Sequence, residues 1–124
     1  HCGDGERDVG YMRRSFPNKA FFNVCGNCDW GSSLEPTLEI TLEGKKIFAT
    51  HGHLYGAKMG LNRLIYAAKE KNADILLYGH THISMNEYDD GMYIINPGSC
   101  HGYGATYCLL DITEKGVLAS IVKA

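Results

Sequence analysis

The stretch Ile75-Leu76-Leu77-Tyr78-Gly79-His80-Thr81-His82 joins an apolar run to a pair of histidines. The run predicts a buried strand, and Gly79 lets the backbone turn where that strand ends. Because side chains two residues apart in a strand point the same way, His80 and His82 can converge on one point. Imidazole is the commonest side-chain metal ligand. The stretch therefore favours a metal site, although exposed loop histidines are the simpler interpretation of a lone His-x-His.

A similar arrangement recurs at three other places in the chain. Asp4, Asn27 and His51 each stand beside a glycine, and Asn27 and His51 each follow an apolar run. A residue without a Cβ lets the backbone approach a site closely. In open α/β sheets, ligands bind in the crevice at the carboxyl ends of the strands. These positions therefore predict that oxygen and nitrogen ligands gather at one edge of a sheet.

Hydrophobic periodicity divides the rest of the chain into short elements. Four apolar residues from Leu61 to Ala68 follow helical spacing, so a helix is expected at 58–71, with Asn72 as its stop. A shorter helix is expected at 7–16. Helices between some strands and hairpins between others predict a layered α/β fold with mixed strand pairing. The expected strands are 20–24, 37–43, 46–50, 75–78, 85–88, 92–95, 106–111 and 117–122.

Composition narrows the class of protein. A chain of 124 residues with 44% hydrophobic content can form one domain with its own core. A net charge of −2 without a basic run leaves no electrostatic footprint for nucleic acid. No apolar stretch reaches the ~18 residues that a membrane-spanning helix needs. The five unevenly spaced cysteines do not suggest a disulfide framework, so a cytoplasmic location is expected. The sequence leaves open whether the chain forms a homo-oligomer.

Four motifs follow one another along the chain: Gly3-Asp4, Gly26-Asn27-Cys28-Asp29, Thr50-His51-Gly52-His53 and Gly79-His80-Thr81-His82. In this order they resemble the motifs of the calcineurin-like metallophosphoesterase superfamily. A fifth, Asn96-Pro97-Gly98, together with Tyr78 before the histidine pair, resembles its small prokaryotic phosphodiesterase subgroup. The resemblance covers essentially the whole chain, and four ordered motifs are far more specific than any one of them.

The resemblance implies a four-layer α/β/β/α sandwich with a two-metal centre. Asp4 would bridge two divalent ions. Asn27, His51 and His80 would complete one site, and His82 would serve the other. Mixed nitrogen and oxygen ligands suit Mn²⁺, which we expect first, or Ni²⁺, Fe²⁺ or Zn²⁺. The implied reaction is hydrolysis of a small phosphate ester, most simply a phosphodiester, by a hydroxide that bridges the metals.

The chain departs from the family pattern in two ways. The family's Asp-x-His motif on a first strand has no counterpart, so we expect residues 1–124 to be a single metallophosphoesterase domain without its first strand-helix-strand segment. Such a chain could lack activity alone. Cys28 also stands where much of the family has a histidine that protonates the leaving group, and a thiol is a poor replacement. His53 and His101 are the candidate substitutes. The catalytic candidates are therefore Asp4, Asn27 and His53.

Two other functions compete with this interpretation. The retromer subunit with the same fold serves as a protein-binding scaffold, so a catalytically inactive scaffold is the main alternative. Cys25 and Cys28 also form a Cys-x-x-Cys pair, which is typical of redox and zinc sites. No second Cys-x-x-Cys accompanies it, and the pair overlaps Asn27, so packing beside the site is the better interpretation of these cysteines.

Overall fold

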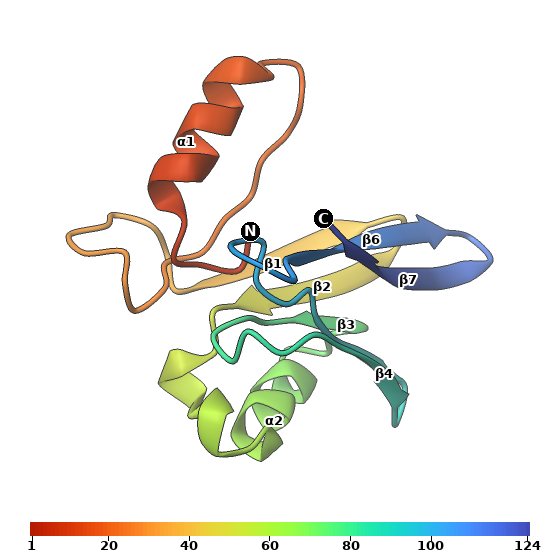
Figure 1. Ribbon diagram of the computed structural model, residues 1–124. Helices are drawn as coiled ribbons and strands as arrows, with labels where there is room; N and C mark the ends of the chain where they lie inside the picture. The colour runs from red at the N-terminus through yellow and green to blue at the C-terminus, as the bar shows by residue number, and fades with distance from the viewer.

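The computed structural model describes residues 1–124 and contains two β-sheets and two α-helices (Figure 1). The larger sheet has five strands in the order β1-β2-β3-β5-β4, and the β2–β3 and β3–β5 pairs are parallel. The outer pairs are antiparallel. The strands are β1 (Thr37–Leu42), β2 (Lys45–Thr50), β3 (Ile75–Leu77), β4 (Met85–Asp89) and β5 (Met92–Asn96).

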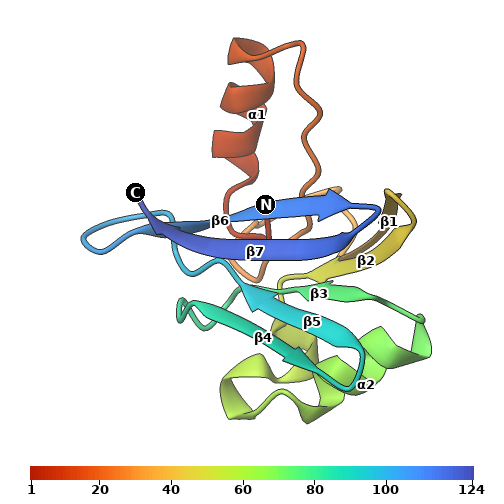
Figure 2. The ribbon, with the colours of Figure 1, turned by 90° about the vertical axis from the view of Figure 1, so that its right-hand side faces the viewer.

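The second sheet is an antiparallel pair formed by β6 (Thr106–Thr113) and β7 (Gly116–Lys123). Helix α2 (Asn62–Glu70) covers one face of the five-stranded sheet, and β6 and β7 cover the other face (Figures 1 and 2). Helix α1 (Glu6–Ser15) projects away from this stack (Figures 1 and 2). The predicted mixed α/β fold is therefore confirmed.

The core lies on both faces of the central strand β3. Leu64 and Ala68 of α2 are fully buried against Phe48 and Leu76 on one face. On the other face Ile75 packs with neighbours that include the inward side chains of β6 and β7. Burying each large aliphatic side chain stabilises the fold by roughly 1.5–3 kcal/mol. This burial on both faces explains why Ile75–Leu77 reads as a continuous apolar run rather than an alternating one.

The predicted helix at 58–71 begins later than expected, because α2 starts at Asn62. Two short 3₁₀ turns, His53–Tyr55 and Ala57–Met59, precede it. Gly56 and Gly60 have φ of 64° and 132°, and these conformations interrupt a helix. The predicted stop is confirmed, because Asn72 has φ of 56° and follows the last helical turn.

The predicted strand at 20–24 is wrong. Only one step of a parallel ladder forms there: the His1 amino group donates to the Phe22 carbonyl at 2.7 Å, and the Val24 N–H donates to the His1 carbonyl at 3.2 Å. A strand needs a continuous row of backbone partners, which this run does not have within residues 1–124. Its apolar character reflects partial burial, since Val24 is almost fully inaccessible to solvent.

Neither α-helix is long and apolar enough to cross a membrane. What positions the site is the parallel core of the large sheet. Strands β2, β3 and β5 run in one direction, so their carboxyl ends meet at one edge. The residues that follow these strands, His51, Tyr78 and Pro97, begin the loops of the candidate site.

Candidate metal centre

Two of the predicted histidine ligands meet because β2 and β3 are parallel neighbours. His51 directly follows β2, and His80 lies three residues beyond β3. The Gly79 N–H donates to the His51 carbonyl at 3.0 Å, which continues the strand pairing beyond the sheet. The His51 and His80 rings have their centroids 4.9 Å apart, and His51 is only 2% exposed. The sheet therefore delivers both rings to one place, as the strand-end pattern predicted.

His51 is fixed in orientation and in tautomer. Its Nδ1 lies 2.6 Å from the carbonyl oxygen of Cys2. A carbonyl can only accept, so this contact places a proton on Nδ1. In the neutral ring, the Nε2 atom then carries a lone pair that points into the cluster. A histidine held in this way by a backbone carbonyl is arranged as metal-ligating histidines commonly are.

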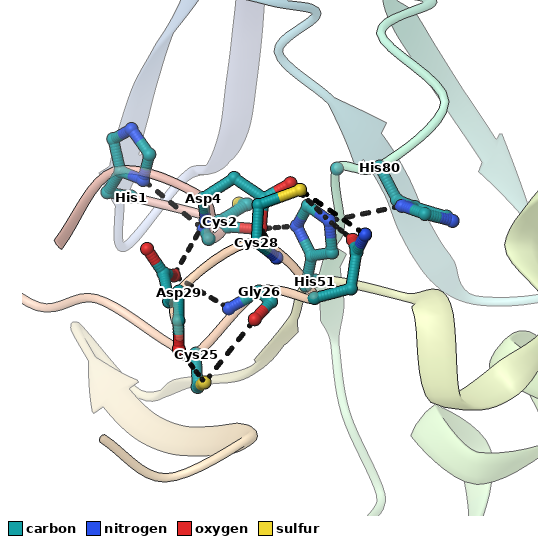
Figure 3. Close-up of polar contacts among 12 residues, drawn as sticks. His1, Cys2, Asp4, Cys25, Gly26, Cys28, Asp29, His51 and His80 are labelled. Carbon is teal, nitrogen blue, oxygen red and sulfur yellow. Dashed lines mark hydrogen bonds and ion pairs between the residues drawn. The ribbon is translucent and has the colours of Figure 1, made fainter. Parts of the chain in front are cut away.

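Three further electron-donating atoms surround that nitrogen (Figure 3). The Nε2 of His51 lies 2.9 Å from the Asn27 Oδ1, 3.2 Å from the Asp4 Oδ2 and 3.1 Å from the His80 Nδ1. A proton on Nε2 or a cation among the four atoms relieves the repulsion between their lone pairs. Two ligand atoms bound at about 2.1 Å on adjacent octahedral positions lie about 3.0 Å apart. The distances from the His51 Nε2 to the other three atoms therefore fit the ligand shell of a divalent metal.

The Asn27 amide is an essential part of this set. Histidine, cysteine, aspartate and glutamate side chains by themselves form no group of three that could hold a metal ion. Asn27 adds an oxygen, and its Nδ2 donates toward the Cys28 Sγ at 3.4 Å, which leaves Oδ1 aimed at His51. Amide oxygen, carboxylate oxygen and imidazole nitrogen together suit first-row divalent ions.

Backbone strain concentrates at the proposed ligands. Asp4, His80 and His82 have φ of 61°, 68° and 61°, although none of them is glycine. Such left-handed residues are uncommon and are found disproportionately at functional sites, where the surrounding structure holds them. The strain also explains why His80 and His82 do not behave as alternate residues of a strand. Their loop leaves the strand conformation after β3, so the two side chains separate.

The predicted site residues do not all gather. His82 is exposed and makes no recorded contact with the cluster. His53 lies closer: its ring centroid is 5.3 Å from that of His51, and its buried Nδ1 has no hydrogen-bond partner. Burial, and then the neighbouring His51, lower the pKa of His53. A neutral ring suits a ligand or proton acceptor better than a donor, so the proton-donor role of His53 stays a prediction. His101 is exposed in the loop before β6.

Asp29 is a structural residue that the sequence interpretation missed. Its carboxylate accepts from the backbone N–H groups of Asp4 and Gly26, each at 2.8 Å, and of Glu6 at 3.2 Å. Burial acts to raise the pKa of Asp29, but the three N–H donors outweigh it and hold that pKa below its usual value. One carboxylate thus ties the Asp4 loop to the Asn27 loop. Its place at the end of Gly26-Asn27-Cys28-Asp29 was the available signal.

Asn96 holds the loop that carries His80 in place through hydrogen bonds, as Asp29 does for the Asp4 and Asn27 loops. Its side chain is fully buried, and its Nδ2 donates to the Gly79 carbonyl at 3.2 Å and to the Thr81 Oγ1 at 3.0 Å. Its Oδ1 accepts from the Gly98 N–H at 2.9 Å. These bonds flank His80 on both sides in the chain. The Asn96-Pro97-Gly98 motif is therefore a brace for the strained His80 backbone as well as a turn.

The cysteine pair is not arranged for redox chemistry. Cys25 and Cys28 are both free thiols. The Cys25 Sγ donates to the Gly26 carbonyl at 3.4 Å, whereas Cys28 is exposed beside Asp4. The Asp4 carboxylate, and to a smaller extent burial, raise the pKa of Cys28. A thiol held protonated is a poor nucleophile and a poor zinc ligand, so the geometry argues against the Cys-x-x-Cys alternative.

Gly26→Ala gives a first testable prediction. A Cβ at this position would overlap the Asp4 carboxylate and approach the Asp4 backbone nitrogen at 2.5 Å, so Asp4 must move. We expect a loss of stability of about 1–3 kcal/mol, as for other overpacked sites, with weaker Mn²⁺ binding. Denaturant unfolding and calorimetry measure the two effects. Gly10→Ala is the matched control, because its Cβ meets only the Arg14 guanidinium at 3.7 Å. Unchanged Mn²⁺ affinity in Gly26→Ala would contradict the prediction.

The donor cluster agrees with the family that the sequence matches. The family described as calcineurin-like phosphoesterase superfamily domain matches residues 1–115. The chain belongs to this superfamily. The chain spans about half the length of two curated relatives that it matches, with 56% and 55% of their residues covered. What the whole proteins do is therefore carried to this chain only as a proposal.

Relatives of this chain come from bacteria and eukaryotes. It is 39% identical over 80% of its length to the probable metallophosphoesterase YsnB of Bacillus subtilis, and 34% identical over 77% to the phosphodiesterase YfcE of Escherichia coli. It is also 39% identical over 64% of its length, and over 42% of the relative's, to vacuolar protein sorting-associated protein 29 of Schizosaccharomyces pombe. The small prokaryotic phosphodiesterase subgroup named from the motifs is confirmed.

A solved structure shows the same fold. A predicted phosphoesterase of Streptococcus pneumoniae superimposes with a TM-score of 0.80 at 24% identity, covering 98% of this chain and 86% of that chain. At this identity the match concerns the fold alone. It supports the metallophosphoesterase type of α/β architecture that the motifs implied.

Proposed function

We propose that this chain carries the metal centre of a divalent-metal-dependent phosphodiesterase that acts on a small phosphate ester. The observation that carries the proposal is the convergence of the Asp4, Asn27 and His80 donor atoms on the His51 Nε2, at 2.9–3.2 Å. The family membership supports the same reaction class. No other cluster of side chains in the chain combines buried imidazole, amide oxygen and carboxylate in this way.

Asp4, Asn27, His51 and His80 would hold one ion, most simply Mn²⁺, with Ni²⁺, Fe²⁺ or Zn²⁺ as alternatives. His82 would serve a second ion. When bound, a pair of such ions activates water and stabilises the negative charge that develops on the phosphoryl oxygens. The chain's own part is positioning. The Cys2 carbonyl fixes the His51 tautomer, and the Asp29 carboxylate holds the Asp4 and Gly26 backbone.

Cys28 bears on which esters the centre would cleave. It occupies the position beside Asp4, and the Asp4 carboxylate raises its thiol pKa. A thiol in the place where much of the family has a histidine contributes little general-acid catalysis. Esters whose leaving group needs no proton, such as nitrophenyl esters, should therefore be better substrates than alkyl esters. His53 remains the predicted proton donor if one is needed.

A functional assay tests the proposal. The protein, with any natural segment that precedes His1, is freed of metal with a chelator, and bis-p-nitrophenyl phosphate is added with and without Mn²⁺. We expect nitrophenolate release that needs the added metal and stops when the chelator returns. Metal-saturated protein that releases no nitrophenolate would rule the enzyme out. Equal rates with and without metal would rule out the metal centre as its cause.

A protein-binding scaffold is the second candidate, and one observation favours it. The vacuolar protein sorting relative shares 39% identity with this chain, the same value as the bacterial metallophosphoesterase. The assay above separates the two functions. A scaffold would keep its fold and could bind metal, but it would release no nitrophenolate. The strained φ values of Asp4 and His80 favour the enzyme, because a scaffold gains nothing from convergent ligands.

A further inference from the structure

A cavity of about 860 Å³ opens beside Asp4, between helix α1 and the loop that carries Cys28 and Asp29. Its volume lies within the range of ~300–1,000 Å³ that is usual for small-molecule sites. Because Asp4 belongs both to the cavity wall and to the metal cluster, a substrate held at the metals could extend into this space. In Figure 3 the Asp29 side of the cluster, which lines the cavity, lies opposite His80.

One face of α1 forms the helical wall of this cavity. Arg7, Gly10, Tyr11 and Arg14 line it. Positions i, i+3, i+4 and i+7 share one side of a helix, so these residues form a continuous strip. Gly10 adds no side chain to the strip, and Tyr11 lies between Arg7 and Arg14 in the chain.

The opposite side of α1 is fastened to the protein, so this face cannot turn away. Val9 is buried. The Arg13 guanidinium donates to the Phe21 carbonyl at 2.8 Å and to the Asn23 Oδ1 at 2.9 Å. These contacts fix the rotation of the helix about its axis. The neighbouring Arg14 points elsewhere, although it has the same chemistry as Arg13.

The two arginines of the cavity are unpaired. Neither Arg7 nor Arg14 takes part in an ion pair or hydrogen bond. Glu6 and Asp8 also line the cavity, but each lies about 100° around the helix from Arg7, at the borders of the strip. The Asp29 carboxylate at the floor is already engaged by three backbone N–H groups. Two positive charges without a partner therefore face the cavity, beside the carboxylates of Asp4, Glu6, Asp8 and Asp29, which also line it.

From this arrangement we propose that the Arg7–Tyr11–Arg14 strip binds the part of the substrate beyond the scissile phosphate. It selects a nucleotide-like phosphodiester that carries a second phosphate beside a planar ring. Guanidinium groups bind phosphate through charge-assisted hydrogen bonds, and the Tyr11 ring offers a surface on which a base can stack. The inference rests on the proposed phosphodiesterase function, because it names the substrate class of that site.

Two matched substrates test the strip. One is thymidine 5′-(p-nitrophenyl phosphate), and the other is the same compound with a 3′-phosphate. We expect the 3′-phosphate to raise kcat/KM about tenfold, the effect of roughly two exposed charge pairs. Arg7→Gln/Arg14→Gln should lose this preference, measured as the ratio of kcat/KM for the two compounds. Arg63→Gln/Lys115→Gln, which removes the same charge elsewhere, should retain the preference. Equal kcat/KM for both compounds in the unaltered protein would overturn the proposal, as would a preference that survives in Arg7→Gln/Arg14→Gln.

A binding measurement keeps this proposal separate from the catalytic one. Calorimetry with thymidine 3′,5′-bisphosphate is performed on the metal-free protein, so it needs no hydrolysis. We expect the unaltered protein and the Arg63→Gln/Lys115→Gln control to bind about tenfold more tightly than Arg7→Gln/Arg14→Gln. If no nitrophenyl ester is cleaved, the phosphodiesterase function fails, and this measurement alone decides the strip. Equal affinity in all three proteins would overturn it.

Discussion

His80→Ala is expected to abolish tight Mn²⁺ binding and to lower phosphodiester hydrolysis by about a hundredfold or more. Loss of a residue that only supports a ligand typically costs 10–100-fold, and His80 is proposed as a ligand itself. Its Nδ1 lies 3.1 Å from the His51 Nε2, at the border of the donor cluster. Calorimetry with Mn²⁺ measures the first effect and nitrophenolate release the second. Tyr66→Ala, at an exposed aromatic residue of α2, is the control and should leave both unchanged.

His80→Gly distinguishes a ligand from a structural residue. The φ of 68° at His80 strains any residue with a Cβ, whereas glycine adopts it readily. We expect His80→Gly to lose the metal as His80→Ala does, but to be more stable than His80→Ala by about 1 kcal/mol. Denaturant unfolding of the metal-free proteins gives the comparison. A His80→Ala protein that binds Mn²⁺ as tightly as the parent would remove His80 from the ligand set.

Asp29→Ala should destabilise the metal-free fold by about 2–3 kcal/mol. A hydrogen bond to a charged group contributes ~1.5–3 kcal/mol, and the total for this carboxylate is reduced because it is partly open to water. Three backbone N–H groups, of Asp4, Glu6 and Gly26, would lose their acceptor. The Asp4 and Asn27 loops would then separate. Urea unfolding measures the loss. Asp111→Ala on the exposed side of β6 is the matched control and should change stability by less than about 0.5 kcal/mol.

The Asp29 carboxylate also predicts that the free energy of unfolding decreases at acid pH. The pKa of Asp29 is lower in the folded chain than its usual value near ~3.9. Its contribution to stability is therefore complete above the unfolded pKa, and it declines as pH falls through the folded pKa. The difference in unfolding free energy between the parent and Asp29→Ala should shrink below about pH 4. A difference that stays constant down to pH 2 would show that the ionised carboxylate is not what holds the loops.

How far the sequence could predict the site depends on the range of the interactions. The convergence of Asp4, Asn27, His51 and His80 was predictable, because each follows a strand or loop with a recognisable motif and parallel strands end at one edge. The role of Asp29 was not predictable in this way. The motif Gly26-Asn27-Cys28-Asp29 marks this residue, but its bond to the Asp4 N–H spans 25 residues, and the motif does not reveal that partner.

The errors have local physical causes. The strand expected at 20–24 failed because an apolar run specifies burial but not a pairing partner. The helix expected from 58 began at Asn62 because two glycines took positive φ values that periodicity does not reveal. His80 and His82 were expected to converge as alternate residues of a strand, yet the left-handed conformation of both places His82 in solvent.

A crystal of the protein grown with Mn²⁺ and measured for anomalous scattering tests the central claim most directly. The account predicts an anomalous peak among the Asp4 carboxylate, the Asn27 Oδ1, the His51 Nε2 and the His80 Nδ1, at about 2.0–2.3 Å from each. The other three atoms already lie 2.9–3.2 Å from the His51 Nε2. A crystal without a peak at this cluster, or with its only peak beside Cys25 and Cys28, would contradict the metal centre.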